Sequence, residues 1–457
     1  MAPALGKRLA VAGIIAFSAL IVYVWQSQLL PDIDKLLPIV RAKPGAGPPV
    51  AVPPVVAHKK IRCPRGFGEG QSASFENKSS ARPRQHQLVT APKIIALVFF
   101  GRRATVSILD CYLKRNLATN GGLLDQVVWL QRTSNAEDLA LLDRLLNSEP
   151  QYARQVVDDA DAHDFASSYD AVVDANMYIK IDDDVVSRSQ PIALPLPSPR
   201  FVPPAHAQQV FIEQDAIRSV VCTKLARPDY YVVSANVVNQ PMISWIHWNL
   251  GAVRPYLPGA GEEYPAPEPG HQVDWRASAL PSWNGSGGVD IDASSWNSPD
   301  GRKHRWLPVR GRPDHVLEKT PIVETQYDAF GTGLHRWQVA AQEHYSFFEN
   351  LESRELWRYK FNTWDFQRLR MGIQFIAMMG HDINAAKPIG RDDEEHFSVT
   401  MPKKLGRNAV ADGRGVVSHY SFGPQSRDGG LDTTDVLDRY RSYAKEKVCM
   451  GPMLWSP

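Results

Sequence analysis

The chain has 457 residues, enough for one large domain or two to three of ordinary size. Hydrophobic residues make up 44% and charged residues 22% of the sequence, which excludes a globally disordered protein. The formal net charge is +2 and no block is rich in Lys and Arg, so we expect no nucleic-acid partner. Four cysteines without C-x-x-C spacing argue against a structural zinc site and leave the disulfide pairing open.

The N-terminus predicts a membrane anchor. Residues 9–25 carry no charge, and as a helix they would span about 26 Å, close to the thickness of an ER-type membrane. Lys7 and Arg8 precede this run and Trp25 ends it, as in a helix with a cytosolic basic flank. No small-residue cleavage site follows, so we favour an uncleaved signal anchor over a cleaved signal peptide or a core helix. Residues 1–8 then form a cytosolic tail, and the rest of the chain is lumenal.

The remainder of the chain divides into a linker and one regular domain. Residues 26–91 are rich in Pro, Gly, Ala and Ser without a sustained period, which predicts a stem. Residues 92–457 show strand–helix alternation, which favours an α/β fold with a largely parallel, Rossmann-type sheet. Strands are predicted at 93–100, 127–130, 177–181 and 230–234, and helices at 106–117, 134–146 (with Ser134 and Glu137 as a capping box), 215–226 and 357–379.

Tryptophan is concentrated in one part of this domain. Nine of the twelve lie between Trp245 and Trp364, around an irregular stretch at 259–321. Aromatic faces stack on sugars, so an acceptor-binding lobe is one interpretation. Core packing, the commoner fate of tryptophan, is the alternative.

The strongest chemical signal is the run Asp182-Asp183-Asp184 at the end of the strand predicted at 177–181. Ligands of open α/β sheets gather at the carboxyl ends of strands. Adjacent carboxylates repel one another unless a cation offsets their charge, and oxygen ligands at this density suit Mn²⁺ or Mg²⁺. Such an ion can bind a pyrophosphate and stabilise its charge as it leaves. A solvated acidic loop is the alternative.

The anchor, the stem and a strand ending in D-x-D together resemble a type II Golgi glycosyltransferase with the GT-A fold. More narrowly, the segments VFFGRRATVSILDCYLKRNL, MYIKIDDDVV, YYVVSANVVNQP and HYSFGPQ look like a fungal family of predicted glycosyltransferases. The resemblance covers roughly residues 92–450. It implies a metal-dependent hexosyl- or related transferase in the Golgi or ER membrane. Such an enzyme moves a sugar from a nucleoside diphosphate donor to a glycan, glycoprotein or glycolipid acceptor.

The resemblance also implies roles for particular residues. The loop after the first strand would contact the nucleotide, and arginine binds phosphate bidentately. A late histidine would complete the metal shell. The implied nucleotide-sugar residues are Gly101, Arg102, Arg103, Asp182 and Asp183, and the implied metal ligands are Asp182, Asp184 and His419. A surface basic pair is the alternative for the arginines, and a hydrogen-bonded core or surface histidine is the alternative for His419.

A second acid run lies at 391–395. An inverting transfer needs a base that takes the proton of the acceptor hydroxyl, and Asp393 and Glu394 are the candidates. The same acids would also suit a helix start, where the N-terminal dipole stabilises them. Two other functions stay open: a non-catalytic lumenal glycan-binding protein on the same fold, and a metal-dependent phosphohydrolase.

Residues 186–209 interrupt the chain directly after the D-x-D motif. They hold six prolines and no period, which is unusual inside a compact fold. Joining Val185 to Val210 yields IDDDVVFIEQDAI, which looks like the uninterrupted pattern of the fungal family. The segment is 24 codons long, and its ends allow a GTGAGT donor and a CAG acceptor. Our hypothesis is an unspliced intron that loops out between strands that stay close together; the alternative is a genuine flexible loop.

Overall fold

The computed structural model describes residues 59–64, 86–157, 165–182, 209–259, 272–285, 303–311, 318–321, 336–422, 425 and 430–455. The predicted anchor at 9–25, Asp183, Asp184 and the insertion up to residue 208 lie outside these ranges. Within the described ranges, no helix is long and apolar enough to cross a membrane.

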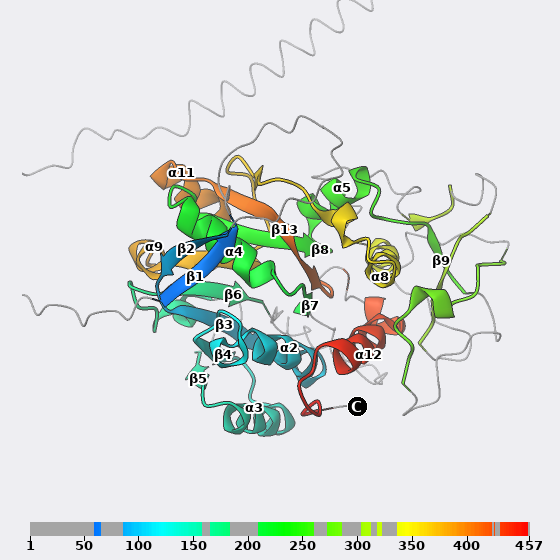
Figure 1. Ribbon diagram of the computed structural model, residues 1–457, viewed down its shortest axis with the longest axis horizontal. Helices are drawn as coiled ribbons and strands as arrows, with labels where there is room; N and C mark the ends of the chain where they lie inside the picture. The colour runs from blue at the N-terminus through cyan, green and yellow to red at the C-terminus, as the bar shows by residue number, and fades with distance from the viewer. Residues whose placement is uncertain are drawn as a thin grey trace, which may run out of the picture. The chain divides into compact units, whose positions relative to one another are not determined.

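A nine-stranded mixed sheet forms the core of the described part (Figure 1). Its strands are β3 (Ile94–Phe100), β4 (Gln126–Gln131), β5 (Tyr152–Val156), β6 (Met177–Ile181), β7 (Gln209–Ile212), β8 (Val232–Val238), β11 (Trp364–Asp365), β12 (Phe375–Met379) and β13 (Ala409–His419). The order is β11-β13-β8-β12-β6-β3-β4-β5, and β7 pairs with β13. Only β7, β11 and β12 run against the other strands of this sheet. The predicted α/β class with a largely parallel sheet flanked by helices is therefore confirmed.

Helices flank this sheet (Figure 1). They are α2 (Arg103–Asn116), α3 (Ala136–Ser148), α4 (Ala216–Ala226), α5 (Pro241–Asn249), α8 (Trp337–Glu352), α9 (Gly380–Ala385), α10 (Asp393–Glu395), α11 (Met401–Leu405) and α12 (Val436–Lys447). Helix α4 packs against β8, β12 and β13, whereas α2 and α12 pack against β7. A small separate pair of strands is formed by β9 (Tyr256–Pro258), just before the stretch expected to be irregular, and β10 (Trp306–Pro308), within it.

The central strands are apolar because both of their faces are covered. Every residue of β3 and of β6 is buried, as the continuous apolar runs predict for interior strands. Strand β5 was not predicted, because YARQV exposes alternate residues at the edge of the sheet and has few apolar positions. The strand predicted at 230–234 begins two residues later and continues to Val238.

The helix predicted at 357–379 is wrong. This stretch contains a 3₁₀ turn at Leu356–Tyr359, β11 and β12. Gln367 and Arg368 have φ of 52° and 64°, values that no α-helix accepts. The apolar end of the stretch is β12, which pairs with β6 on one side and β8 on the other. A short apolar run does not by itself distinguish a buried strand from a helix.

The start of α3 also differs from the prediction. The side chain of Asn135 accepts hydrogen bonds from the backbone N–H groups of Glu137 and Asp138, at 2.9 and 3.2 Å. Asn135 is therefore the N-cap, one residue after the predicted Ser134. Asparagine is among the best N-cap residues, since its short side chain reaches the free N–H groups of the first turn.

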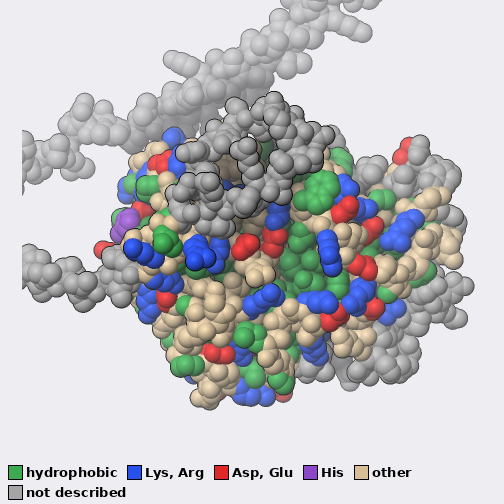
Figure 2. All heavy atoms as spheres, viewed as in Figure 1, with side chains coloured by type: hydrophobic (Ala, Val, Ile, Leu, Met, Phe, Trp, Pro, Cys, Tyr) green, Lys and Arg blue, Asp and Glu red, His purple; other side chains and the backbone are tan. Residues whose placement is uncertain are grey.

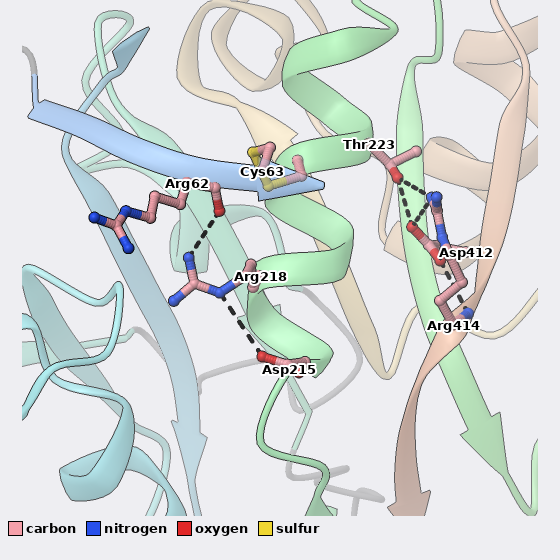
Figure 3. Close-up of a disulfide and its surroundings, with 8 residues drawn as sticks. Arg62, Cys63, Asp215, Arg218, Thr223, Asp412 and Arg414 are labelled. Carbon is pink, nitrogen blue, oxygen red and sulfur yellow. Dashed lines mark hydrogen bonds and ion pairs between the residues drawn. A yellow bond between two sulfur atoms is a disulfide. The ribbon is translucent and has the colours of Figure 1, made fainter. Parts of the chain in front are cut away.

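Part of the predicted stem belongs to the folded unit. Strands β1 (Lys59–Pro64) and β2 (His86–Ala91) form an antiparallel pair, and β2 leads into β3. Cys63 of β1 forms a disulfide with Cys222 of α4 (Figure 3). Close to this disulfide, Arg218 donates a 2.9 Å hydrogen bond to the backbone oxygen of Arg62. The hairpin is thus held to α4 by one covalent and one polar contact.

A second disulfide joins Cys111 of α2 to Cys449, just after α12. All four cysteines are therefore paired, and none is free. The two bridges close long stretches of chain, with separations of 159 and 338 residues. The structure selects one of the pairings that the sequence left open.

Most of the clustered tryptophans that the structure describes contribute to packing. Trp275, Trp283, Trp306 and Trp337 are at most 5% exposed, as the core-packing interpretation expects. Trp357, at 62%, is the most exposed of the group.

Figure 2 shows a face on which Lys and Arg alternate with Asp and Glu, around a patch of hydrophobic side chains near the centre.

Candidate active site at the end of β6

Strand β6 places the first acid of the D-x-D motif. Asp182 directly follows β6, and its backbone N–H donates a 3.0 Å hydrogen bond to the backbone oxygen of Gln374. Residues two apart in a strand share a face, so Lys180 lies on the same side of the sheet as Asp182. The Nζ atom of Lys180 is 2.7 Å from Oδ1 of Asp182, and Lys180 is only 4% exposed. The acid motif therefore begins beside a buried ammonium group.

The same ammonium group contacts the second acid run. Oδ2 of Asp393 lies 3.4 Å from Nζ of Lys180 and accepts a 2.6 Å hydrogen bond from the hydroxyl of Tyr169. Burial, followed by the charge of Asp393, raises the pKa of Tyr169 well above its usual value, so this hydroxyl stays a donor. Asp182 and Asp393, predicted separately from distant parts of the sequence, thus meet at one buried lysine.

The run at 391–395 contains a helix cap and, next to it, a buried acid. It starts α10, and the side chain of Asp392 caps this helix by accepting a 2.9 Å hydrogen bond from the N–H of Glu395. Asp393 is instead buried and directed at Lys180. Among the described residues no contact uses its second oxygen, Oδ1. Glu394 is held by Arg370, whose Nε lies 2.7 Å from the Glu394 carboxylate. Of the two candidate bases, Asp393 has the more suitable geometry.

These acids line a hollow of about 320 Å³ at the end of β6. Its walls are mostly polar and carry both signs of charge. They are formed by Phe165, Asp182, Arg370, Ile373, Gln374, Arg391, Asp392, Asp393 and Glu394. The hollow thus combines Asp182, both candidate bases and two arginines.

His419, the predicted third metal ligand, is the last residue of β13 and lies opposite Gln209 of β7. It is fully buried, and from the described residues no hydrogen bond of normal geometry reaches either ring nitrogen. Burial lowers the pKa of His419 to about 3, assisted by His344 and Lys180 and opposed by the backbone of Asn239. The imidazole is therefore neutral near pH 7, which is the form that binds metals. The structure thus places His419 in the core, and its role as a metal ligand stays a prediction.

The predicted nucleotide loop lies at the neighbouring strand end. Gly101 separates β3 from α2, and Arg102 is the N-cap of α2. Arg103 forms an ion pair with Glu137 at the start of α3, and its guanidinium lies 5.8 Å from the ring of Trp455. These contacts direct Arg103 toward α3 and the C-terminal segment, and its side chain stays 30% exposed. The nucleotide-binding role of the three residues stays a prediction.

Several residues in and around the site were not predicted as functional, among them Lys180, Tyr169 and Arg132. Lys180 and Tyr169 contact Asp393, and Arg132 follows β4, where it is 5% exposed with its guanidinium 4.5 Å from the ring of Phe165. A lysine inside the apolar run MYIKI was a visible signal, since a buried lysine needs a partner. Nothing local to Tyr169 or Arg132 indicated their positions.

The donors that the structure describes agree in kind with a site for Mn²⁺ or Mg²⁺. Asp182 offers carboxylate oxygens, and His419 offers a neutral imidazole whose ring nitrogens make no hydrogen bond of normal geometry to the described residues. Asp183 and Asp184 lie outside those residues, and within them no group of three potential ligands is assembled. In comparisons with known proteins, the chain matches no family model and no curated protein.

Proposed function

We propose that this protein is a metal-dependent glycosyltransferase with a GT-A-like fold, which moves a sugar from a nucleoside diphosphate donor to an acceptor hydroxyl. The observation that carries the proposal is the meeting of Asp182 and Asp393 at Lys180. A donor site for a diphosphate needs a cation-binding acid, and an inverting transfer needs a second carboxylate as base. Both lie in one hollow at the carboxyl end of β6, where ligands of open α/β sheets bind.

The roles of the chain's residues follow from their contacts. Asp182, Asp184 and His419 would hold Mn²⁺ or Mg²⁺, which when bound supplies positive charge for the departing diphosphate. The Oδ1 atom of Asp393 would accept the proton of the acceptor hydroxyl. Tyr169 and Lys180 fix the other oxygen of Asp393 and thereby orient the carboxylate.

Two disulfides support a place in the secretory pathway. Disulfides persist in oxidising compartments and are rare in the cytosol, and here all four cysteines are paired. Together with the anchor predicted at 9–25, this supports a single-pass type II protein of the Golgi or ER membrane with a lumenal catalytic domain. The acceptor would be a glycan, glycoprotein or glycolipid.

A screen of nucleotide-sugars tests this proposal. The full-length protein is incubated with each donor in Mn²⁺ or in EDTA, and released nucleoside diphosphate is measured. We expect at least one donor to be hydrolysed slowly, and only with metal. Release of phosphate from simple phosphate esters, with no preference for nucleotide-sugars, would favour the phosphohydrolase. Binding of glycans without hydrolysis of any donor would favour the glycan-binding protein.

A further inference from the structure

Lys180 occupies the position between the two carboxylates of the candidate site. Its Nζ atom lies 2.7 Å from Asp182 and 3.4 Å from Asp393, so the contacting carboxylate oxygens are no more than about 6 Å apart. The ring of Phe99 lies on another side of the ammonium group, 5.3 Å from Nζ. A lysine is rarely this deeply buried without partners, because removing its charge from water is costly. In this arrangement the ammonium group offsets the charge of the two acids.

This arrangement conflicts with binding of a divalent cation by Asp182. A carboxylate that already contacts an ammonium group attracts a second cation less strongly. A metal ion on Asp182 would also repel the ammonium group across a few ångströms. Asp393 offers the ammonium group a second partner within reach. The geometry therefore allows Lys180 to give up Asp182 and keep Asp393.

We propose that Lys180 is a positioning residue that neutralises Asp182 in the metal-free protein and is displaced toward Asp393 when a divalent cation binds. Metal binding then strengthens the contact that fixes Asp393, so the metal site and the candidate base are coupled through one side chain. This inference rests on the metal site of the proposed function, but it does not depend on which reaction the site catalyses.

The test is a Mn²⁺ titration of full-length wild-type protein and Lys180→Met, followed by calorimetry and by melting temperature. Without metal, Lys180→Met should melt at a lower temperature, because Asp182 and the buried Asp393 lose a counter-ion. It should bind Mn²⁺ about tenfold more tightly than wild type, and Mn²⁺ should raise its melting temperature by more. If Lys180→Met does not fold, Lys180→Gln, which is neutral but can donate hydrogen bonds, is titrated in the same way.

Lys224→Met is the matched control. Lys224 is a second buried lysine paired with an acid, 3.3 Å from Asp382, and neither residue lines the hollow of the candidate site. Its loss should lower the melting temperature and leave Mn²⁺ affinity unchanged. A merely structural role of Lys180 would produce the same pattern.

Equal or weaker Mn²⁺ binding by Lys180→Met than by wild type would overturn the inference. So would the absence of Mn²⁺ binding by both proteins, which would also remove the metal from the proposed function. If the tenfold effect is found but no nucleotide-sugar is hydrolysed, the inference holds and the proposed reaction fails. If wild type hydrolyses a donor with Mn²⁺ but Lys180→Met binds Mn²⁺ no more tightly than wild type does, the proposed reaction holds and the inference fails.

Discussion

The hydroxyl of Tyr169 donates a 2.6 Å hydrogen bond to Oδ2 of Asp393, which lies 224 residues further along the chain. The contact is buried and directed to a carboxylate, and such hydrogen bonds contribute about 1.5–3 kcal/mol to stability. Tyr169→Phe should therefore lower the free energy of unfolding by an amount in that range. It should also lower the rate of transfer to acceptor, because the Asp393 carboxylate loses a donor that orients it.

Tyr256→Phe is the control for this variant. The Tyr256 hydroxyl also donates a 2.6 Å hydrogen bond to a carboxylate, that of Glu349, but neither residue lines the hollow. We expect a similar loss of stability measured by chemical denaturation, with an unchanged rate of transfer. A transfer rate that falls equally in both variants, or in neither, would contradict the assigned role of Asp393.

A buried acid outside the hollow makes stability depend on pH. Burial raises the pKa of Glu343 to about 8, although Ser244 donates a 2.9 Å hydrogen bond to its carboxyl group. The group is protonated in the folded chain and ionised in the unfolded chain between about pH 4.5 and 8, so its contribution to stability falls as pH rises through this window. From pH 6.5 to 8 this contribution should fall by about 2 kcal/mol, whereas the buried histidines, which are half protonated in the unfolded chain at pH 6.5, change stability in the opposite direction.

Glu343→Gln isolates this effect. The glutamine oxygen can still accept the hydrogen bond from Ser244, and the side chain does not ionise. The free energies of unfolding of wild type and variant are compared by denaturant titration at pH 6.5 and pH 8. The free energy of unfolding of the variant minus that of wild type should be about 2 kcal/mol larger at pH 8 than at pH 6.5. Parallel behaviour at both pH values would show that Glu343 is ionised in the folded protein.

The two disulfides should be important for stability. Each disulfide closes a long stretch of chain, so removing either one should lower the free energy of unfolding by about 2–5 kcal/mol. The double substitutions are Cys63→Ser with Cys222→Ser, and Cys111→Ser with Cys449→Ser. Denaturation with and without reductant measures the loss. Thiol titration of the unreduced, denatured protein should find no free cysteine. Free thiols in that sample, or a melting temperature unaffected by reductant, would refute the pairing.

The hypothesis of an unspliced intron makes a prediction about folding. A chain that lacks residues 186–209 loses Gln209, the first residue of β7, whose buried side-chain amide has no hydrogen-bond partner among the described residues. The shortened protein should therefore fold and melt at the same temperature as the full chain or higher. Sequencing of the transcript decides the origin of the segment: 72 nucleotides that persist in mature message would refute the hypothesis.

Short runs of residues predicted the strands and helices whose structure depends on neighbouring residues in the sequence. The run MYIKI predicted β6 to the residue, since a strand covered on both faces must be apolar throughout. The run FIAMM carried the same signal and was assigned to a helix. Its position between β6 and β8 is a property of the whole sheet, which periodicity within the run does not encode.

The candidate site could likewise be predicted only in part from the sequence. Both acid runs were visible in the sequence, because clusters of carboxylates are costly and stand out. Their meeting at Lys180 depends on pairing between strands and on the placement of α10, so no spacing in the sequence predicted it. The role of Asp392 as the helix cap, and the burial of Asp393 beside it, also required the geometry of the folded chain.

The most direct test of the central claim measures two quantities in Mn²⁺ with the preferred nucleotide-sugar: the release of nucleoside diphosphate and the transfer of sugar to acceptor. Both are measured for wild type, Asp184→Ala and Asp393→Asn. Melting temperature confirms that each variant is folded. The account predicts turnover by wild type that EDTA abolishes, no turnover by Asp184→Ala, and transfer to acceptor reduced at least a hundredfold in Asp393→Asn. Full turnover by folded Asp184→Ala in buffer that contains metal would contradict the account.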